Sequence, residues 1–232
     1  MNKKTIILLA DSPVLNPTVI KPFRNLSAEY SVYLNSLLIS NWIEIINAIN
    51  ENIVPVVLLS EQDKEYIPKN FFPDNFTSIF FNGPRLDNLK EDLFKAQSIN
   101  DSKVLIIFYN SIGLKQSDII RVFNLIHAEE TSLVIAKSNR DKVILTCSYE
   151  IERGLIDPLI SSNRNFQNYL NFISSKDIFI HTLEGFISID DFEDIKKLYI
   201  ELSKKESLSY CSPKMHESFN DLFVEYKEKL NV

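Results

Sequence analysis

The sequence predicts an α/β fold of three layers, in which helices cover both faces of a mixed, mostly parallel sheet. The runs at residues 5–10 and 104–109 are continuously apolar, which is typical of strands buried on both faces. Strand-like and helix-like segments also alternate through residues 1–130, the order that parallel strands joined by crossover helices require. Together these two observations predict an α/β/α sandwich.

The first half of the chain supplies the alternating elements. The clearest helix has apolar residues at three- and four-residue steps from Tyr30 to Ile49. Pro55, near the start of the second strand, indicates an edge position or a bulge. Ser117, which is followed by Asp118, is the expected N-cap of the helix that ends at His127. The segments expected here are a helix at 27–50, strands at 52–60 and 78–82, and helices at 86–98 and 117–127.

The second half of the chain breaks the alternation. Paired strands at 131–136 and 143–147 make the sheet mixed; a sheet that stayed parallel past residue 130 would instead indicate a doubly wound Rossmann-like protein. We expect a single domain over residues 1–232, with a helical extension from about residue 205 that packs outside or at a dimer contact. The remaining segments expected are helices at 163–174, 191–204 and 212–230 and short strands at 177–182 and 186–189.

Composition excludes several classes of protein. The net charge of −6 and the pI of about 5.2 argue against binding of nucleic acid or an anionic membrane by bulk charge. The first apolar run is too short for a signal peptide or a membrane span, so we expect a cytoplasmic protein. The four glycines are not clustered, and neither a Walker A loop nor a GxGxxG fingerprint is present in the sequence. Cys147 and Cys211 form no CxxC pair or zinc spacing.

Three stretches resemble a known family. VLIIFYNSIGLKQSDIIRVF, at 104–123, is similar to a strand, a Gly-Thr-Asp-x-Pro-x-Leu-Thr loop and a helix of that family. FISIDDFEDIKKLY, at 186–199, resembles its Asp-x-Asp-Thr-Pro-Glu-Asp-Leu stretch, and Ala10, Pro13 and Val14 resemble its Phe-Ala-Lys-x-Pro start. The likeness spans residues 4–204. In these stretches the chain resembles proteins of the GT-A-like nucleotidyltransferase fold. Within that fold it is most similar to a small bacterial glycosyltransferase-like family related to the molybdenum-cofactor and phospholactate guanylyltransferases.

The resemblance implies a nucleotide-diphospho-sugar transferase fold and a Mg²⁺ or Mn²⁺ ion that neutralises the diphosphate of an activated nucleotide. The family's metal-binding Asp corresponds to Asn110 in this sequence. In the family's C-terminal Asp-x-Asp motif, the first Asp corresponds to Ser188, whereas the second is retained as Asp190. Asp190 and Asn110 are therefore the expected metal ligands, since these ions prefer hard oxygen donors. The alternatives are structural: Asp190 with Glu193 forms a capping-box pattern, and Asn110 ends a strand.

Basic residues are the candidates for binding phosphate. Lys21 and Arg24 are what remains of the family's Lys-Thr-Arg signature, and with Asn110 and Arg140 they are the expected nucleotide-binding residues. Arg140 and Lys142 stand where the family has Asp-Gly-Gly-Tyr, either as cationic substitutes for a lost metal or as ordinary turn residues. Asp11 and Arg85 are weaker candidates, for a replacement metal ligand and a phosphate contact respectively.

Two functional hypotheses remain open. One is a divergent nucleotidyl- or glycosyltransferase-like protein that binds a nucleotide or nucleotide-sugar, with weak or no catalysis. The other is a non-catalytic homologue that has lost the metal site and serves as a scaffold for a protein partner or a homodimer. We expect no nucleic acid partner and no membrane span under either hypothesis.

Overall fold

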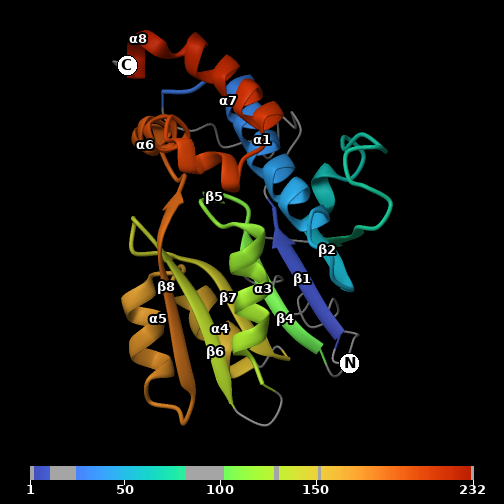
Figure 1. Cartoon of the computed structure of the whole chain (residues 1–232), viewed down its shortest axis with the longest axis vertical. Helices are drawn as coiled ribbons and strands as arrows, with labels where there is room; N and C mark the ends of the chain where they lie inside the picture. The colour runs from blue at the N-terminus through green and yellow to red at the C-terminus, as the bar shows by residue number, and fades with distance from the viewer. Residues whose placement is uncertain (1–2, 11–24, 82–101, 128–130, 151–152, 231–232) are drawn as a thin grey trace.

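The computed structural model describes residues 3–10, 25–81, 102–127, 131–150 and 153–230. The described strands form an eight-stranded sheet in the order β3-β2-β1-β4-β7-β6-β8-β5 (Figure 1). Their bounds are β1 Lys3–Leu9, β2 Ile53–Ser60, β3 Thr77–Phe81, β4 Ser102–Phe108, β5 Ser111–Ile112, β6 Ser132–Ser138, β7 Val143–Tyr149 and β8 Phe179–Ser188.

The sheet is mixed, as predicted. Strands β3, β2, β1 and β4 are parallel to one another. Strand β7 runs antiparallel to both β4 and β6, β8 is parallel to β6, and β5 is antiparallel to β8. The reversal at β7 excludes the alternative of a sheet that stays parallel past residue 130.

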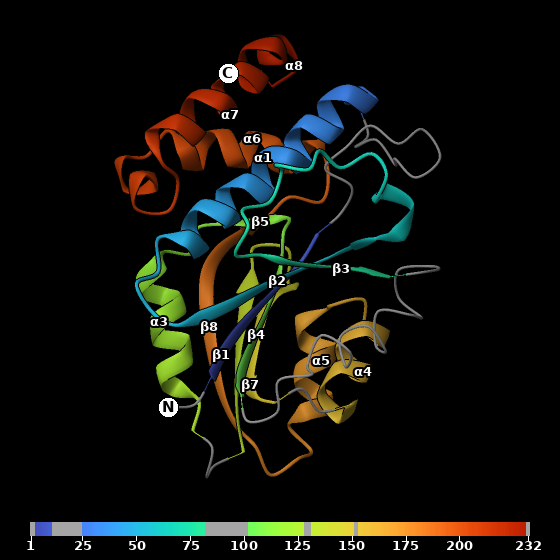
Figure 2. The same cartoon turned by 90° about the vertical axis from the view of Figure 1, so that its right-hand side faces the viewer.

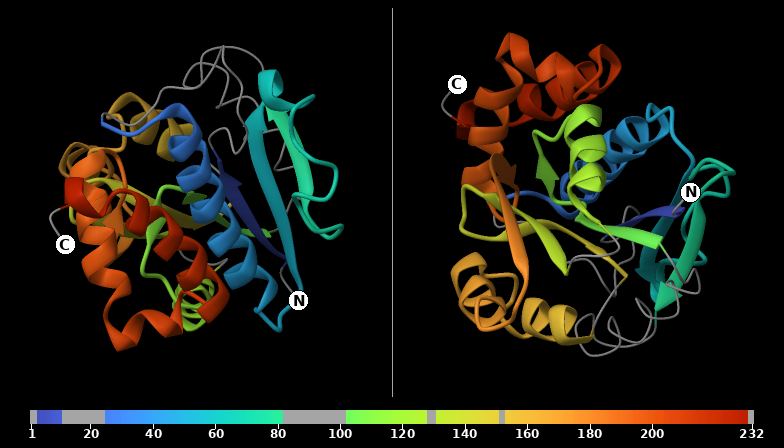
Figure 3. Two further views of the ribbon diagram at one scale, coloured as in Figure 1. Left: turned by 90° about the horizontal axis from the view of Figure 1, so that it is seen from above. Right: turned by 60° about the horizontal axis from the view of Figure 1, so that its bottom comes forward.

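Helices cover both faces of the sheet, which confirms the three-layer prediction (Figures 2 and 3). Successive strand residues point to opposite faces, so Ile6 and Leu8 belong to one apolar cluster while Ile7 and Leu9 belong to the other. The larger cluster lies beneath α1 Ala28–Asn47, α3 Gln116–Leu125, α6 Phe192–Leu202 and α7 Pro213–Glu225. The smaller cluster lies beneath α4 Arg153–Ser161 and α5 Phe166–Ile173.

Several predicted bounds are corrected. The two short strands predicted at 177–182 and 186–189 are parts of one strand, β8 Phe179–Ser188, whose register with β6 shifts near Gly185, a glycine with φ +96°. Helix α4, with Pro158 inside it, was not predicted, because proline usually ends a helix. Helix α5 begins at Phe166 rather than 163, and the N-cap of α3 is Lys115, whose backbone N–H donates to Asp118. The helix expected at 86–98 lies outside the described residues.

Pro55 lies in β2, which is flanked by both β1 and β3. Pairing with β1 includes Pro55, opposite Ile6, whereas pairing with β3 begins one residue later, at Val56. Proline has no backbone N–H to donate to a ladder, and it is tolerated at Pro55 because the strand has a described neighbour on one side only at that position.

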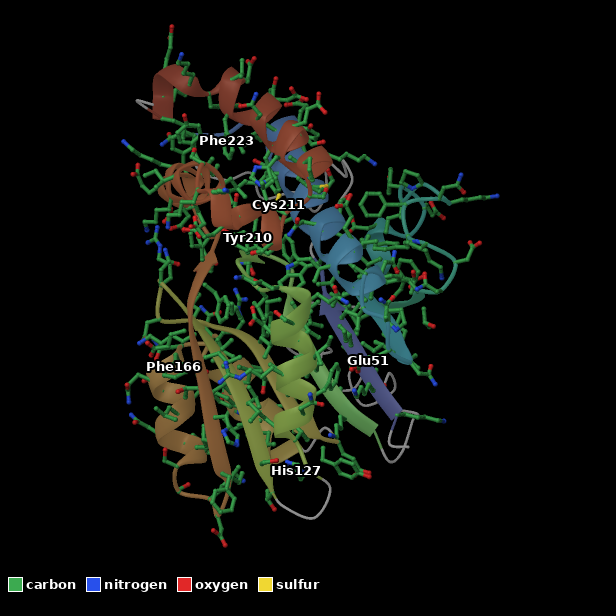
Figure 4. All side chains as sticks on the ribbon, in the orientation of Figure 1. Glu51, His127, Phe166, Tyr210, Cys211 and Phe223 are labelled. Carbon is green, nitrogen blue, oxygen red and sulfur yellow. The ribbon has the colours of Figure 1, made fainter. Side chains whose placement is uncertain are left out.

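The C-terminal helices belong to the same apolar cluster as the sheet. Phe219 of α7 is fully buried, and the Tyr33 hydroxyl of α1 donates to the Ser218 carbonyl at 3.1 Å. The rings of Tyr30 and Tyr226 meet edge to face at 5.1 Å between centroids. Phe223 lies at the same end of the molecule, with Tyr210 and Cys211 (Figure 4). The remaining short helices are η1 Glu61–Asp63, η2 Lys205–Ser209 and α8 Lys227–Leu230.

None of the helices in the described part of the chain is long and apolar enough to cross a membrane.

The packing of α7 generates a stability prediction. Phe219→Ala should lower the free energy of unfolding by about 3–5 kcal/mol, since it leaves a cavity in the shared core. Val224→Ala, on the exposed side of the same helix, should change it by less than about 0.5 kcal/mol. Urea denaturation followed by circular dichroism measures both. If Phe219→Ala instead released a separate helical transition and left the main one unmoved, α7 would not be part of the sheet's cooperative unit.

Candidate functional site

The carboxyl ends of β4 and β8 meet at one edge of the sheet. Asn110 follows β4 and Asp190 follows β8; the backbone N–H of Ile189 donates to the Asn110 carbonyl at 2.8 Å. Next to this bond, Ser111 pairs with Ser188 in the short β5–β8 ladder. In open α/β sheets, ligands bind at the carboxyl ends of the strands, so this edge is the expected place for a site.

Trp42 of α1 holds the loop after β4. Its indole N–H donates to the carbonyls of Tyr109, at 3.2 Å, and Ser111, at 3.0 Å, and its side chain is fully buried. The Ser111 hydroxyl donates to the Phe108 carbonyl at 2.7 Å. The sequence identified Trp42 as part of an apolar helix face, and this second role follows from the tertiary packing.

Asp190 lies at the centre of a cluster of polar side chains at this edge of the sheet. Its Oδ1 atom accepts from Asn110 Nδ2 at 3.0 Å and from Lys142 Nζ at 2.8 Å. Its Oδ2 atom accepts from the Ser188 hydroxyl at 3.0 Å. The structure thus brings together the two expected metal ligands, with the lysine considered as a substitute for the metal.

Arg164 is a member of the cluster that sequence reasoning missed. Its guanidinium lies over the Phe108 ring at 4.3 Å from the centroid and donates from Nη1 to Asn110 Oδ1 at 3.2 Å. Its Nη2 lies 3.7 Å from Asp190 Oδ1. The residue fell inside a predicted helix, but Asn163 and Arg164 have φ of +50° and +62°, so the chain turns before α5 begins. The sequence offered no signal for this turn beyond the presence of Asn163.

A second network fastens the β6–β7 turn to the start of α6. The N-cap of α6 is Asp191, in a capping box with Asp194, so the expected box of Asp190 with Glu193 is wrong by one residue. Arg140 Nε donates to Asp194 at 2.8 Å, and its Nη2 donates to Asp191 at 2.6 Å. The shift places the capping role on Asp191 and leaves the Asp190 carboxylate pointing into the cluster.

Asn139 joins the same turn to β8. Its side-chain oxygen accepts from the Ser188 backbone N–H at 3.2 Å, and its own N–H donates to the Phe186 carbonyl at 2.9 Å. The two cations of this turn have different partners. Arg140, which was expected to contact nucleotide, pairs with Asp191 and Asp194, whereas Lys142 pairs with Asp190.

Asp194 carries its charge in a buried position. Burial raises the pKa of its carboxyl. Hydrogen bonds from Arg140, Lys197 and the Asp190 backbone, together with the Arg140 charge, lower the pKa by more than burial raises it, so the pKa lies below its usual value. The Arg140 pKa is raised in turn, chiefly by its hydrogen bond to Asp194. The pair therefore stays ionised at neutral pH.

Four sequence candidates lie outside the described residues: Asp11, Lys21, Arg24 and Arg85. Ala10, the last described residue before Asp11, donates its N–H to the Leu58 carbonyl, and Tyr109 donates to the Leu9 carbonyl.

The oxygens at this edge are a poor fit to Mg²⁺ or Mn²⁺. Both lone pairs of Asp190 Oδ1 are occupied by the N–H groups of Asn110 and Lys142, and Ser188 occupies one lone pair of Oδ2. The Asn110 oxygen already accepts from Arg164. A divalent ion 4 Å from the Lys142 ammonium would also be repelled by about 8 kcal/mol at an effective dielectric constant of about 20. In the described part of the chain, no group of three or more His, Cys, Asp or Glu side chains could hold a metal.

Comparison with solved structures decides the fold. A Desulfovibrio desulfuricans protein assigned as a nucleotide-diphospho-sugar transferase superimposes with a TM-score of 0.74 over 100% of this chain and 98% of its own, at 10% identity. The chain has the nucleotide-diphospho-sugar transferase fold. No protein-family model and no curated protein matches the sequence.

Two further proteins share the nucleotide-diphospho-sugar transferase fold. The 4-diphosphocytidyl-2C-methyl-D-erythritol synthase of Anaerococcus prevotii gives a TM-score of 0.55 at 12% identity, over 88% of this chain and 99% of that protein. A Mycobacterium tuberculosis protein crystallised with manganese gives 0.50 at 10% identity, over 85% and 97%. The fold resemblance made from sequence is thereby confirmed.

The buried carboxylate of Asp194 generates a pH prediction. Because its folded pKa lies below the unfolded value of about 3.9, its stabilisation is fully present above about pH 4 and is lost as the pH falls through the folded pKa. Asp194→Asn should lower the free energy of unfolding by about 1–3 kcal/mol at neutral pH, and its difference from the wild type should shrink in acid. Urea denaturation between about pH 7 and pH 3 measures this.

The matched control is Glu193→Gln, in the same turn of α6 but exposed, which should change the free energy of unfolding by less than about 0.5 kcal/mol. A difference for Asp194→Asn that stayed constant into acid would contradict the ionised state assigned to Asp194.

Proposed function

We propose that this protein binds a nucleotide or nucleotide-sugar at the cluster of Asn110, Lys142, Arg164 and Asp190, with weak or no catalysis. The observation that carries the proposal is that two cations, Lys142 and Arg164, converge on the carboxylate of Asp190. A partly buried cationic cluster at the carboxyl edge of the strands attracts a phosphate group.

The fold supports the choice of ligand. The Anaerococcus protein of the same fold is named as a diphosphocytidyl-methylerythritol synthase, and the Desulfovibrio protein is named for nucleotide-diphospho-sugars. Both names describe ligands with a nucleoside and a diphosphate. We extend this ligand class to the present chain because its cationic cluster lies at the strand edge where the fold receives ligands.

The remaining sequence candidates take separate roles in this proposal. Lys21 and Arg24, which lie outside the described residues, are proposed to contact the phosphates because they correspond to the basic signature of the family that the sequence resembles. Arg140 is proposed to hold the β6–β7 turn, from which Lys142 projects, through its contacts with Asp191 and Asp194. A metal-dependent version, with Mg²⁺ or Mn²⁺ on Asp190 and Asn110, would require Lys142 to leave the carboxylate.

The second candidate function is a non-catalytic scaffold that binds a protein partner or a second copy of the chain. The observation that favours it is the internal use of Asp190, whose carboxylate serves three side chains of the protein itself. A carboxylate that joins β4, β7 and β8 in this way contributes to stability without any ligand.

Thermal unfolding with a panel of nucleoside triphosphates and nucleotide-sugars, with and without Mn²⁺, separates the two candidates. One ligand of the panel at a hundredfold excess over its Kd should stabilise the protein by about 2.7 kcal/mol and raise the midpoint by about 5–10 °C. Lys142→Met should reduce this shift, because it removes a phosphate contact. Lys137→Met, at the end of β6 just before the same turn and paired with Asp141, is the matched control and should retain the shift.

A panel that leaves the midpoint unmoved in every condition would contradict nucleotide binding and favour the scaffold. Turnover of a bound ligand would show as release of pyrophosphate or of the nucleoside diphosphate. Turnover at about 1 s⁻¹ or faster, as in ordinary enzymes, would contradict weak or absent catalysis.

A further inference from the structure

We propose that Lys142 occupies the place beside Asp190 that a divalent cation would need, so that a bound diphosphate is neutralised by Lys142 and Arg164 without a metal. The part that concerns diphosphate rests on the function proposed above. The part that concerns the exclusion of the metal stands on the described contacts alone, and it can be tested without any nucleotide.

The first step of the argument is the coordination of Asp190. A carboxylate oxygen accepts about two hydrogen bonds, and Oδ1 has Lys142 Nζ at 2.8 Å and Asn110 Nδ2 at 3.0 Å. The Arg164 guanidinium lies 3.7 Å from the same oxygen. An ion that approached Oδ1 would have to displace an ammonium and then remain beside a guanidinium. The charge that a metal would supply to this carboxylate is therefore already supplied by side chains.

The second step concerns why asparagine, rather than aspartate, suits position 110. The Asn110 amide donates to Asp190 and to the Ile189 carbonyl, and its oxygen accepts from Arg164. An aspartate here could accept from Arg164 but could not donate to Asp190, and two carboxylates at this distance would repel each other unless a cation lay between them. Asparagine therefore suits a cluster without a metal, and Asn110 acts as a positioning residue.

The third step is the capacity of the two cations for phosphate. An ammonium carries three N–H donors, and Lys142 directs one to Asp190 while its side chain is about 29% exposed. The Phe108 ring lies beneath the Arg164 guanidinium and orients it. Arginine forms paired hydrogen bonds with phosphate oxygens, so the two side chains together can hold a diphosphate in the role of a metal.

The first experiment measures Mn²⁺ binding by the loss of the electron paramagnetic resonance signal of free Mn²⁺. The wild type should leave the signal nearly unchanged at concentrations where the double variant Asn110→Asp, Lys142→Met lowers it. The double variant places a second carboxylate beside Asp190 and removes the ammonium, so its Mn²⁺ affinity should rise at least about tenfold. Lys142→Met alone should give a smaller rise in the same direction.

The matched control for this experiment is Lys137→Met, which removes a lysine that pairs with Asp141 and should leave the Mn²⁺ affinity unchanged. Melting temperatures show whether each variant is folded; if the double variant does not fold, Lys142→Met decides the question. Wild-type protein that binds Mn²⁺ as tightly as Lys142→Met would overturn the exclusion of the metal.

The second experiment measures inorganic pyrophosphate binding by calorimetry in EDTA and in Mn²⁺. The wild type should bind pyrophosphate in EDTA, Lys142→Met should weaken binding about tenfold or more, and Lys142→Arg should restore most of it. Lys137→Met should bind as the wild type does. Rescue by arginine separates a charge contact with phosphate from a purely structural role of Lys142.

The outcomes of the second experiment distinguish the two proposals. Binding that required Mn²⁺ would overturn the replacement of the metal while leaving nucleotide binding intact. Failure of pyrophosphate and of the whole nucleotide panel in both conditions would overturn nucleotide binding and the diphosphate part of this inference together. Binding in EDTA that depends on the charge of residue 142 is the result expected from the structure.

Discussion

The junction between the ends of β4 and β8 is the constraint on which the site depends. One backbone hydrogen bond, from Ile189 to Asn110, fixes two segments that are far apart in sequence. Because this bond sets the distance between the strand ends, the side chains of Asn110 and Asp190 meet directly. The buried indole of Trp42 fixes the same loop from the helical layer, so the junction is rigid on both sides.

Two networks of ion pairs lie at this junction, and they involve different carboxylates. In one, Asp194 and Asp191 hold Arg140 and fasten the β6–β7 turn to α6. In the other, Asp190 gathers Lys142 and Arg164. The networks are linked because the Asp190 backbone N–H donates to Asp194. The buried, paired carboxylate of Asp194 stabilises the fold, and we propose that the two cations beside Asp190 bind phosphate.

Much of the fold could be predicted because it follows from local patterns. Continuous apolar runs such as Val104–Tyr109 are buried on both faces of the sheet, and the periodicity of the helix that begins after Ser27 matches its buried face. Prediction failed where two local signals competed. Pro158 hid a real helix, and the capping pattern of Asp190 with Glu193 was displaced by the one at Asp191 with Asp194.

The sequence by itself determined the class of fold and the positions of most of its strands, since these depend on apolar patterns along the chain. The resemblance of its motifs to a known family made Asn110, Lys142 and Asp190 candidates. The tertiary structure alone decided that Arg164 joins them and that Lys142, rather than Arg140, reaches Asp190. The reason is physical: which cation meets which carboxylate depends on distances of a few ångströms, set by strand register and by left-handed turns such as that at Arg164.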